Sequence, residues 1–330
     1  MADGITPPIV LIGGTGRSGT NITKEILGMH SRMYALPFEH RITVDPDGLV
    51  DFYNSFTNSW SPYLVDRRVM RLEAFLHSLA RRNLWHFTLG KAIKLFDPRG
   101  KRLSPASYCD WSLHDYFPNY IAHVDALVQA LVSFRYRASW VGTPSYTAWP
   151  EMRYSPPQEK VDLALLLGSF INKLVADCLR QKGRGIFVED NTWNILFARD
   201  LLDFTPQAKL LHVYRDPRDV VASLTHQRWA PNEPRQVALW VNDIMRVWHK
   251  VKASLPARSY LEVSLESIVA NTKTALEGIC SFIGVEPEPV MFDLDLSRAH
   301  IGRWKAELSR EDARGAQEVL NEWIDEYGYA

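Results

Sequence analysis

The glycine-rich stretch near the start of the chain is the first place where residue types and spacing suggest chemistry. The apolar residues 9–12 lead into Gly13 to Asn21, which read GGTGRSGTN. Glycines let successive backbone N–H groups turn toward one point, and a helix that begins after such a loop adds the positive end of its dipole. We therefore predict a strand, a loop that binds a phosphate-like anion and then a helix, with Arg17 as a permanently charged donor in the loop.

This loop differs from the phosphate loop of nucleoside triphosphatases. Gly14 and Gly19 have the spacing of the G-x-x-x-x-G-K-[ST] pattern, but Thr20 and Asn21 stand where the lysine and the magnesium-binding hydroxyl belong. A P-loop kinase or nucleotide hydrolase is therefore a disfavoured alternative, and a non-catalytic nucleotide-binding module is another. We expect no metal ion at the loop.

A second stretch, residues 209–223, has the same strand-to-helix organisation. Its apolar part ends at Arg215, and Pro217 can begin a helix because its missing N–H is not needed there. Ser223 then lies two turns along that helix. In this order, the two stretches make the chain resemble the sulfotransferases that use 3′-phosphoadenosine 5′-phosphosulfate, PAPS.

The resemblance implies a bound PAPS and the residues that hold it. In that family the first loop holds the 5′-phosphosulfate, and an arginine and a serine eight positions later hold the 3′-phosphate; Arg215 and Ser223 match this spacing. A basic segment near the C-terminus folds over the 3′-phosphate in the family, and residues 300–305 are similar to it. The product is then adenosine 3′,5′-bisphosphate, PAP. The implied ligands are Gly16, Arg17, Ser18, Gly19, Thr20, Asn21, Arg215, Ser223, Arg303 and Lys305.

The resemblance also implies a catalytic glutamate at the end of the strand that follows the loop helix, which is Glu39 in this sequence. Sulfuryl transfer needs a base for the acceptor's proton and donors that neutralise charge on the transferring group, a catalytic role that we give to Arg17. His40 is the alternative base because its ordinary pKa suits the task, although strand alternation would point it away from Glu39. Arg41 is the predicted substrate-binding residue. The alternative for Glu39 is that it is only a solvated strand-end carboxylate paired with Arg41.

Two departures from the family pattern stand out. The lysine that many relatives carry in a K-T-P segment before the second phosphate motif is absent from residues 187–192. Its role at the leaving group must pass to Arg17, to Lys24 or to another part of the chain, or be lost. A tyrosine common in a later strand of the family is replaced by Leu265, so adenine contacts are expected to differ.

Composition limits the classes of partner and the cell compartment that we expect. The 330 residues include 38 basic and 38 acidic side chains, so no net charge favours nucleic acid or an anionic membrane. Only three cysteines are present, far apart, which argues against a disulfide framework and a zinc site. We find no basic leader and no apolar run of membrane-spanning length. These features predict a cytoplasmic protein without a nucleic-acid partner or a membrane span. The resemblance to the sulfotransferases implies a small-molecule or carbohydrate acceptor.

The elements that must position these residues are parallel strands at 9–12, 33–37, 185–189 and 209–214, separated by helices. They predict an α/β fold with a P-loop-like central parallel sheet flanked by helices. The carboxyl ends of such strands meet at one edge, where ligands bind. We expect one sulfotransferase domain over residues 1–330, with a helical, aromatic-rich insertion at about 43–160 that covers the acceptor site. The sequence favours a hydroxyl over an amine as acceptor but does not identify it.

Overall fold

The computed structural model describes residues 6–330 except 84, 86–87, 89–107, 109 and 144–147. Cys109 and the first residues of the chain therefore lie outside the described part. The chain forms two compact units. The first unit contains the residues up to Glu39 together with 182–202 and 206–330, and the second contains His40–Gln181 and Asp203–Thr205.

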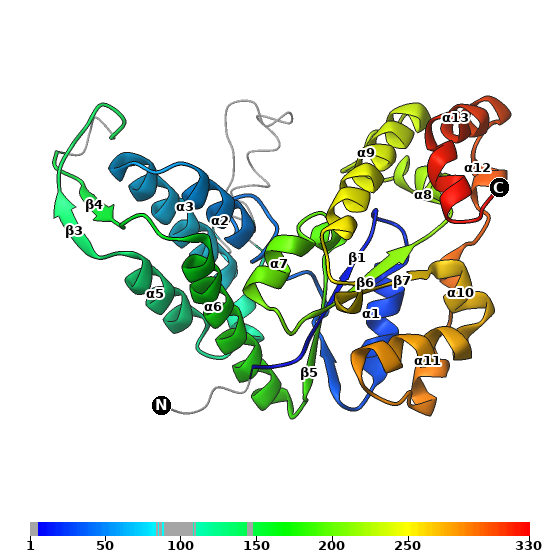
Figure 1. Cartoon of the computed structure of the whole chain (residues 1–330), viewed down its shortest axis with the longest axis horizontal. Helices are drawn as coiled ribbons and strands as arrows, with labels where there is room; N and C mark the ends of the chain where they lie inside the picture. The colour runs from blue at the N-terminus through cyan, green and yellow to red at the C-terminus, as the bar shows by residue number, and fades with distance from the viewer. Residues whose placement is uncertain (1–5, 84, 86–87, 89–107, 109, 144–147) are drawn as a thin grey trace. The chain divides into compact units, whose positions relative to one another are not determined.

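A five-stranded parallel sheet forms the centre of the first unit (Figure 1). Its strand order is β2-β5-β1-β6-β7, and every neighbouring pair is parallel. The central strands β1 and β5 are buried along their whole length, which explains their continuous apolar character. The predicted parallel α/β fold is confirmed. The strands are β1 (Ile9–Gly13), β2 (Met33–Ala35), β5 (Ile186–Asp190), β6 (Lys209–Tyr214) and β7 (Tyr260–Ser264).

Helices α1 (Thr20–Met29), α10 (Leu265–Ala270) and α11 (Thr272–Ile283) pack on one face of this sheet. The apolar residues of α1 and α11 recur at three- and four-residue spacing and meet alternate residues of β1 and β6. The apolar residues of these helices and strands together form one hydrophobic core. It includes Val10, Ile12, Ile26, Leu27, Leu211, Val213, Leu276 and Ile279.

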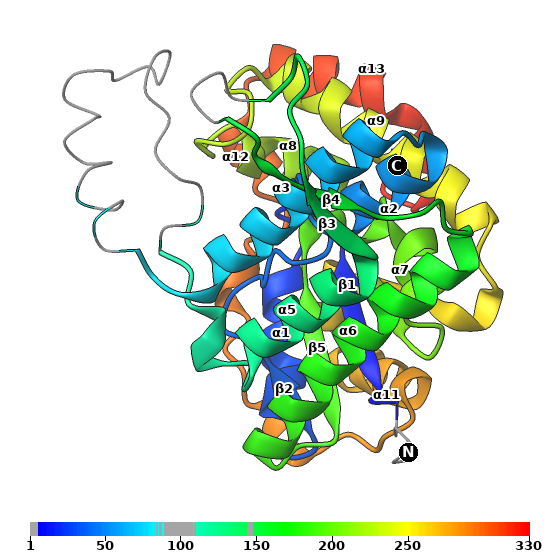
Figure 2. The same cartoon turned by 90° about the vertical axis from the view of Figure 1, so that its left-hand side faces the viewer.

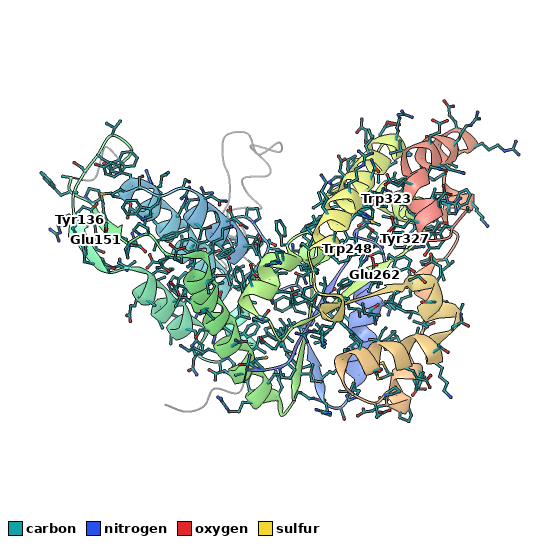
Figure 3. The ribbon with its side chains drawn as sticks, viewed as in Figure 1. Tyr136, Glu151, Trp248, Glu262, Trp323 and Tyr327 are labelled. Atoms are coloured by element: carbon teal, nitrogen blue, oxygen red, sulfur yellow. The ribbon has the colours of Figure 1, made fainter. Side chains whose placement is uncertain are left out.

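The opposite face carries α9 (Pro234–Ala253), with α8 (Pro217–Leu224) and α13 (Arg310–Glu326) packed beside it. Trp248 of α9 contacts the His212 ring of β6, with ring centroids 4.9 Å apart. Glu262 of β7 accepts hydrogen bonds from Trp248 and from Tyr327, which follows α13 (Figure 3). Because the helices after β1 and β6 cover opposite faces, a crevice is expected where the carboxyl ends of these adjacent strands meet.

The second unit is mainly helical (Figure 2). The hairpin of β3 and β4 packs against α3, and its Phe134 and Tyr154 rings are stacked with centroids 4.7 Å apart. Helix α5 ends at Leu131, and residues from Phe134 on pair as a strand. The elements are α2 (Leu49–Asn58), α3 (Pro62–Ala80), α5 (Tyr120–Leu131), β3 (Phe134–Arg137), β4 (Glu151–Tyr154) and α6 (Lys160–Lys182).

Short elements complete the fold. No helix in the described ranges has the length and apolar character needed to cross a bilayer. The short helices are η1 (Leu113–Asp115), η2 (Thr192–Ile195), α7 (Ala198–Phe204), η3 (Ala257–Ser259), η4 (Pro289–Phe292), η5 (Ser297–Ala299) and α12 (Trp304–Glu307).

Candidate functional site

The glycine-rich loop connects β1 to α1 through backbone conformations that glycine favours. Gly16 has φ +80° and Gly19 has φ +107°, and Arg17 between them also lies in the left-handed region at +57°. A Cβ atom at Gly19 would lie 2.7 Å from Cδ1 of Leu265. The loop therefore needs glycine at position 19 for its backbone and for its neighbour. Leu265, which stands where relatives have a tyrosine, packs against the loop.

Parts of this loop lack an internal hydrogen-bond partner, although the Gly14 amide donates to the carbonyl of Thr192 at 3.1 Å. No side chain caps the N-terminus of α1, and its first turn contains no acidic residue. The hydroxyl of Ser18 is fully buried, and no hydrogen-bond partner for it is found among the described residues. Uncapped amides at a helix start and a buried hydroxyl are a favourable environment for an anion.

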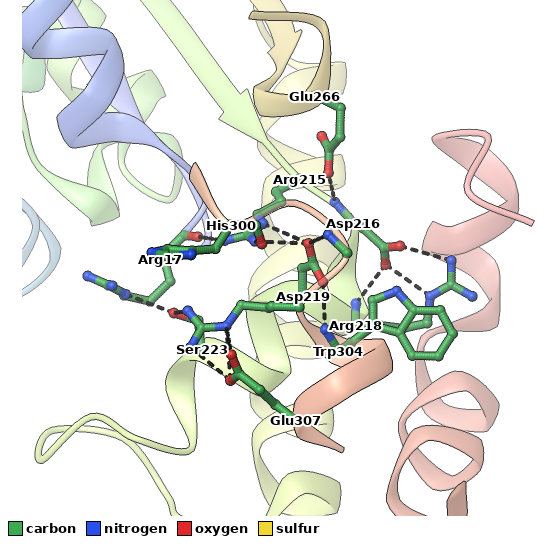
Figure 4. Close-up of polar contacts among 12 residues, drawn as sticks. Arg17, Arg215, Asp216, Arg218, Asp219, Ser223, Glu266, His300, Trp304 and Glu307 are labelled. Atoms are coloured by element: carbon green, nitrogen blue, oxygen red, sulfur yellow. Dashed lines mark hydrogen bonds and ion pairs between the residues drawn. The ribbon is translucent and has the colours of Figure 1, made fainter. Parts of the chain in front are cut away.

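Two arginines from distant parts of the chain meet at Ser223, and a third, Arg215, contacts the loop backbone (Figure 4). Arg17 donates from Nε to the Ser223 hydroxyl at 3.0 Å, and Arg303 donates from Nη1 to the same oxygen at 2.9 Å. Arg215 at the end of β6 donates from Nη1 to the backbone carbonyl of Arg17 at 3.3 Å. The structure thus brings together the loop, the second motif and the basic segment near the C-terminus, as predicted. We call these four residues the Ser223 cluster.

Asp219 of α8 joins this cluster to the basic segment. Its carboxylate is fully buried and accepts from Arg215 Nη2 at 2.9 Å, from the Gly302 amide at 2.7 Å and from the Trp304 amide at 2.9 Å. Arg215 Nη2 also donates to the carbonyl of His300 at 2.5 Å. Arg215 is therefore largely occupied by protein partners and holds the segment in place. Asp219 lies in the second motif, but the sequence analysis gave it no role.

The positive charges of the Ser223 cluster lie close enough to affect one another. Partial burial, followed by the charges of Arg303 and Arg215, lowers the pKa of Arg17. Arg303 is offset in part by Glu307, which accepts from its Nη2 at 2.8 Å. The remaining repulsion would be relieved by a polyvalent anion, which is the chemistry of a phosphate site.

Lys305 does not join the Ser223 cluster. Its side chain is exposed, and its ammonium lies 5.8 Å from the ring centroid of Trp304. The Arg218 guanidinium lies 4.4 Å from the same ring centroid and also pairs with Asp216 at 2.9 Å. Trp304 is therefore a packing partner for cations beside the basic segment, and Arg303 is the member of that segment that reaches Ser223.

Carboxyl groups gather where β2 and β5 end, and the sequence analysis missed two of them. Asp190 pairs with Lys24 of α1 at 2.8 Å, and both side chains are buried. The neighbouring Glu189, only 2% exposed, accepts from Asn194 Nδ2 at 2.5 Å. Burial raises the pKa of Glu189 to about 8, and the charges of Asp190 and Glu39 add to this rise. The sequence signal for these carboxyl groups was two adjacent acidic residues, Glu189 and Asp190, in the segment where the family's lysine is absent.

The candidate bases follow β2 but are not part of it. The strand ends at Ala35, two residues earlier than predicted, so strand alternation does not decide where Glu39 and His40 point. Glu39 is half-buried in the first unit. His40 is buried in the second unit, where its Nδ1 accepts from the Ile42 amide at 3.1 Å. Burial, followed by the charge of Arg41, lowers the pKa of His40 to about 3, so its ring is neutral near pH 7.

Arg41 also belongs to the second unit, where it has partners of its own. Its Nη1 lies 3.5 Å from the carboxylate of Asp45, and its guanidinium lies 5.9 Å from the Trp111 ring centroid. Its φ of +66° marks a sharp change of chain direction. These contacts fix Arg41 within a local polar group of the second unit.

Trp229 is a further residue at the loop that the sequence analysis did not single out. A Cβ atom at Gly16 would lie 3.2 Å from Cη2 of this indole, and Trp229 is 52% exposed. Its ring packs against Trp240 of α9 at a centroid distance of 5.9 Å. A large aromatic surface therefore borders the glycine-rich loop, although nothing in the local sequence pattern marks it.

A model of the sulfotransferase family matches residues 105–289. No curated protein is significantly similar in sequence. Among solved structures, the chain is similar to the sulfotransferase domain of the Synechococcus olefin synthase, at 18% identity and TM-score 0.44 over 96% of this chain and 89% of that one. It is similar to the sulfotransferase STF1 of Mycobacterium tuberculosis, at 13% identity and TM-score 0.44 over 96% of this chain and 76% of that one. It is also similar to a mouse sulfotransferase complexed with PAP, at 15% identity and TM-score 0.33 over 47% of this chain and 70% of that one.

The family match and the geometry coincide in the second motif. The matched residues make up more than half of the chain and include Arg215, Asp219 and Ser223. The protein is therefore a member of the sulfotransferase family.

Proposed function

We propose that the protein transfers a sulfuryl group from PAPS to a hydroxyl, less readily to an amine, of a small-molecule or carbohydrate acceptor. The contacts of Arg17 and Arg303 with the Ser223 hydroxyl, together with the contact of Arg215 with the Arg17 carbonyl, are the observation that carries this proposal. It makes a second anion site beside the glycine-rich loop. A donor with a phosphosulfate at one end and a separate 3′-phosphate needs two such sites.

The residues present suit this donor. The loop from Gly16 to Thr20, with its uncapped helix start and the buried Ser18 hydroxyl, would hold the 5′-phosphosulfate. Ser223, Arg303 and Arg17 would hold the 3′-phosphate, with Arg215 and Asp219 fixing their positions. The donor supplies the activated sulfuryl group. Asn21, the second residue of α1, is exposed.

Glu39 is the residue that we assign as general base. Its carboxylate would take the proton from the acceptor hydroxyl as the acceptor oxygen bonds to sulfur and the bond from sulfur to the phosphate oxygen breaks. Backbone amides of the loop would stabilise the growing charge on the leaving oxygen. Arg17 is directed to Ser223, so we assign the role of the missing lysine to Lys24, whose ammonium is held at the end of β5 by Asp190.

Two features of the chain bear on the acceptor and on the compartment. The exposed indole of Trp229 beside the loop favours an acceptor with a flat ring or a sugar face, because both stack on aromatic surfaces. The low cysteine content favours a reducing compartment such as the cytoplasm.

Thermal-shift measurements test the donor. We expect PAP to raise the unfolding temperature, and ATP with magnesium to do so far less, because the loop lacks the lysine and the magnesium-binding hydroxyl of a kinase. A larger shift with ATP and magnesium would instead favour a P-loop kinase. A PAPS turnover assay in excess EDTA tests the chemistry; PAP binding without turnover on any acceptor would indicate a non-catalytic module.

A further inference from the structure

The guanidinium of Arg303 divides its donors between a protein carboxylate and the Ser223 cluster. Its Nε lies 3.0 Å from each carboxylate oxygen of Glu307, and its Nη2 donates to Oε2 of the same carboxylate at 2.8 Å. The remaining nitrogen, Nη1, donates to the Ser223 hydroxyl at 2.9 Å. Because a guanidinium is planar and rigid, a carboxylate that holds its Nε edge also sets the direction of Nη1.

Glu307 is itself held from two sides, beside Ser223 (Figure 4). It is the last residue of α12 and lies one helical turn after Arg303. Its Oε2 also lies 3.4 Å from Nε2 of His226, which follows α8. The side chains of Arg303 and Glu307 are 17% and 32% exposed, so water screens this pair only in part. The carboxylate therefore ties the guanidinium to a fixed place beside the end of α8.

The backbone that carries Arg303 is fixed separately. Asp219 accepts from the amide of Gly302 at 2.7 Å and from the amide of Trp304 at 2.9 Å, the two residues that flank Arg303. Nη1 of Arg303 carries two hydrogens, and the contact with Ser223 uses one of them. Backbone and side chain are thus both oriented before a ligand binds, with one hydrogen left to donate. Such preorganisation lowers the entropy cost of binding.

We propose that Glu307 is a positioning residue for the 3′-phosphate site, which holds the guanidinium of Arg303 so that Nη1 is directed to the phosphate. The inference rests on the proposed function. Glu307 also brings a negative charge near the site, which by itself would weaken the binding of an anion. Its carboxylate is bonded to the Nε edge, away from Nη1, so we expect the gain from orientation to exceed this repulsion.

Calorimetry with PAP and with adenosine 5′-phosphosulfate, which lacks the 3′-phosphate, tests this inference on the intact protein. We expect Glu307→Ala to weaken PAP binding by roughly three- to tenfold, because the ligand must then order a long side chain. Binding of adenosine 5′-phosphosulfate should change by less than about twofold. Glu318→Ala is the matched control, since Glu318 of α13 is an exposed carboxylate 4.0 Å from Arg235 and outside the Ser223 cluster. It should bind both ligands like the wild type.

A double-mutant cycle separates positioning from a general effect of charge or folding. In an Arg303→Ala background, Glu307→Ala should leave PAP affinity within about twofold, because no guanidinium remains to be positioned. A carboxylate that acted only through its charge would weaken PAP binding in both backgrounds, so its removal would strengthen binding in both. A carboxylate that only stabilised the fold would affect both ligands and both backgrounds alike.

The outcomes separate the two proposals. Tighter or unchanged PAP binding in Glu307→Ala would overturn the role of Glu307 and leave the proposed function standing. Equal losses for the two ligands, or an equal loss of PAP affinity in the Arg303→Ala background, would also overturn it. Absence of PAP binding by the wild type would overturn both. If Glu307→Ala does not fold, Glu307→Gln takes its place with the same expected direction, since the amide keeps a single acceptor oxygen for two donors.

Discussion

At the scale of single residues, the predicted ligands differ in how far their side chains are occupied by protein partners. Arg303 and Ser223 meet through a hydrogen bond at the cluster, whereas Arg215 is 4% exposed and bonded mainly to Asp219 and to backbone carbonyls. This division changes which substitution tests the 3′-phosphate site. Arg215→Ala would leave the Asp219 carboxylate buried without its cation, so its effect on binding would be mixed with an effect on folding.

Arg303→Ala should weaken PAP binding by roughly ten- to a hundredfold, since a hydrogen bond to a charged group contributes about 1.5–3 kcal/mol. Adenosine 5′-phosphosulfate, which lacks the 3′-phosphate, should bind nearly as before. Calorimetry with both ligands measures the difference. Lys305→Ala is the matched control, because Lys305 lies over Trp304 and outside the Ser223 cluster; we expect less than about a threefold change. Equal losses for both ligands in Arg303→Ala would remove it from the 3′-phosphate site.

Glu39→Gln should abolish most turnover without loss of PAP. The amide keeps the shape of the side chain but cannot take a proton near neutral pH, and general-base catalysis supplies about 10²–10⁴-fold. We therefore expect kcat to fall by that factor in a sulfation assay, with the PAP dissociation constant changed by less than about threefold.

His40→Asn should cost less than Glu39→Gln. The pKa of His40 is lowered to about 3, so its ring is a weak base, and Nδ1 already accepts from the Ile42 amide. If His40→Asn abolishes turnover while Glu39→Gln retains more than roughly a tenth of it, the assignment of the base is wrong.

At the scale of elements, Asp219 connects the start of α8 to the segment that follows η5. Asp219→Ala removes the acceptor for Arg215 and for two backbone amides and leaves a buried arginine unpaired. Breaking a buried pair in this way costs about 3–5 kcal/mol of unfolding free energy. Urea denaturation should measure this loss, and PAP binding should weaken with it. Asp243→Ala, at an exposed position on α9, should change the unfolding free energy by less than about 0.5 kcal/mol; similar losses in both variants would contradict the role of Asp219.

The individual strands, loops and helices of this site could be predicted from the sequence better than the side-chain contacts between them. The strand, loop and helix around Gly16 could be predicted because glycine spacing, apolar runs and Pro217 act over a few residues. The resemblance to the sulfotransferases also implied that Arg303 would lie near Ser223, at the 3′-phosphate. The pairing of Lys24 with Asp190 and the burial of Glu189 could not be predicted, because they depend on side chains that meet only when separate strands pair.

Trp229 illustrates the same limit. Its neighbours Gly16 and Trp240 come from the loop after β1 and from α9, and an exposed tryptophan in a connecting segment has no periodic pattern. β2 was overestimated for a related reason: the chain after Ala35 is apolar enough to extend the strand, but its pairing with β5 ends at Val188.

At the scale of the whole molecule, the chain alternates between two compact units, and all members of the Ser223 cluster lie in the first. His40 and Arg41 lie in the second. A single functional domain with an insertion at about 43–160 stays a prediction. The second unit contains many aromatic residues. Family members are expected to differ by acceptor in this part of the chain.

Acid stability of the first unit should depend on Glu262. Burial alone would raise the pKa of this carboxyl, but hydrogen bonds from His212 and Trp248 and the charge of Lys252 hold it at about 2. A depressed carboxyl pKa stabilises the fold above the ordinary value near 4.5, and this contribution is lost as pH falls from there toward 2. Glu262→Gln should therefore lose about 2–3 kcal/mol of unfolding free energy at pH 7 and much less at pH 3.

Urea denaturation at both pH values measures the Glu262 contribution. Glu277→Gln, at an exposed position, should match the wild type at pH 7 and at pH 3 within about 0.5 kcal/mol. A deficit in Glu262→Gln that is equally large at pH 3 would show that the packing of the side chain, and not its charge, supports β6, β7 and α9.

The hydroxyl of Ser223 has one further property that follows from its two arginine contacts. A serine oxygen has two lone pairs, and Arg17 and Arg303 occupy both, so the group can offer a ligand only its hydrogen. Such a group can donate to an unprotonated oxygen of a phosphate. Because the second ionisation of a phosphate monoester lies near pH 6, the ligand loses a negative charge below this pH, and its attraction to Arg17 and Arg303 should weaken in acid. The working pH range of the enzyme would then be bounded below by a proton on the ligand.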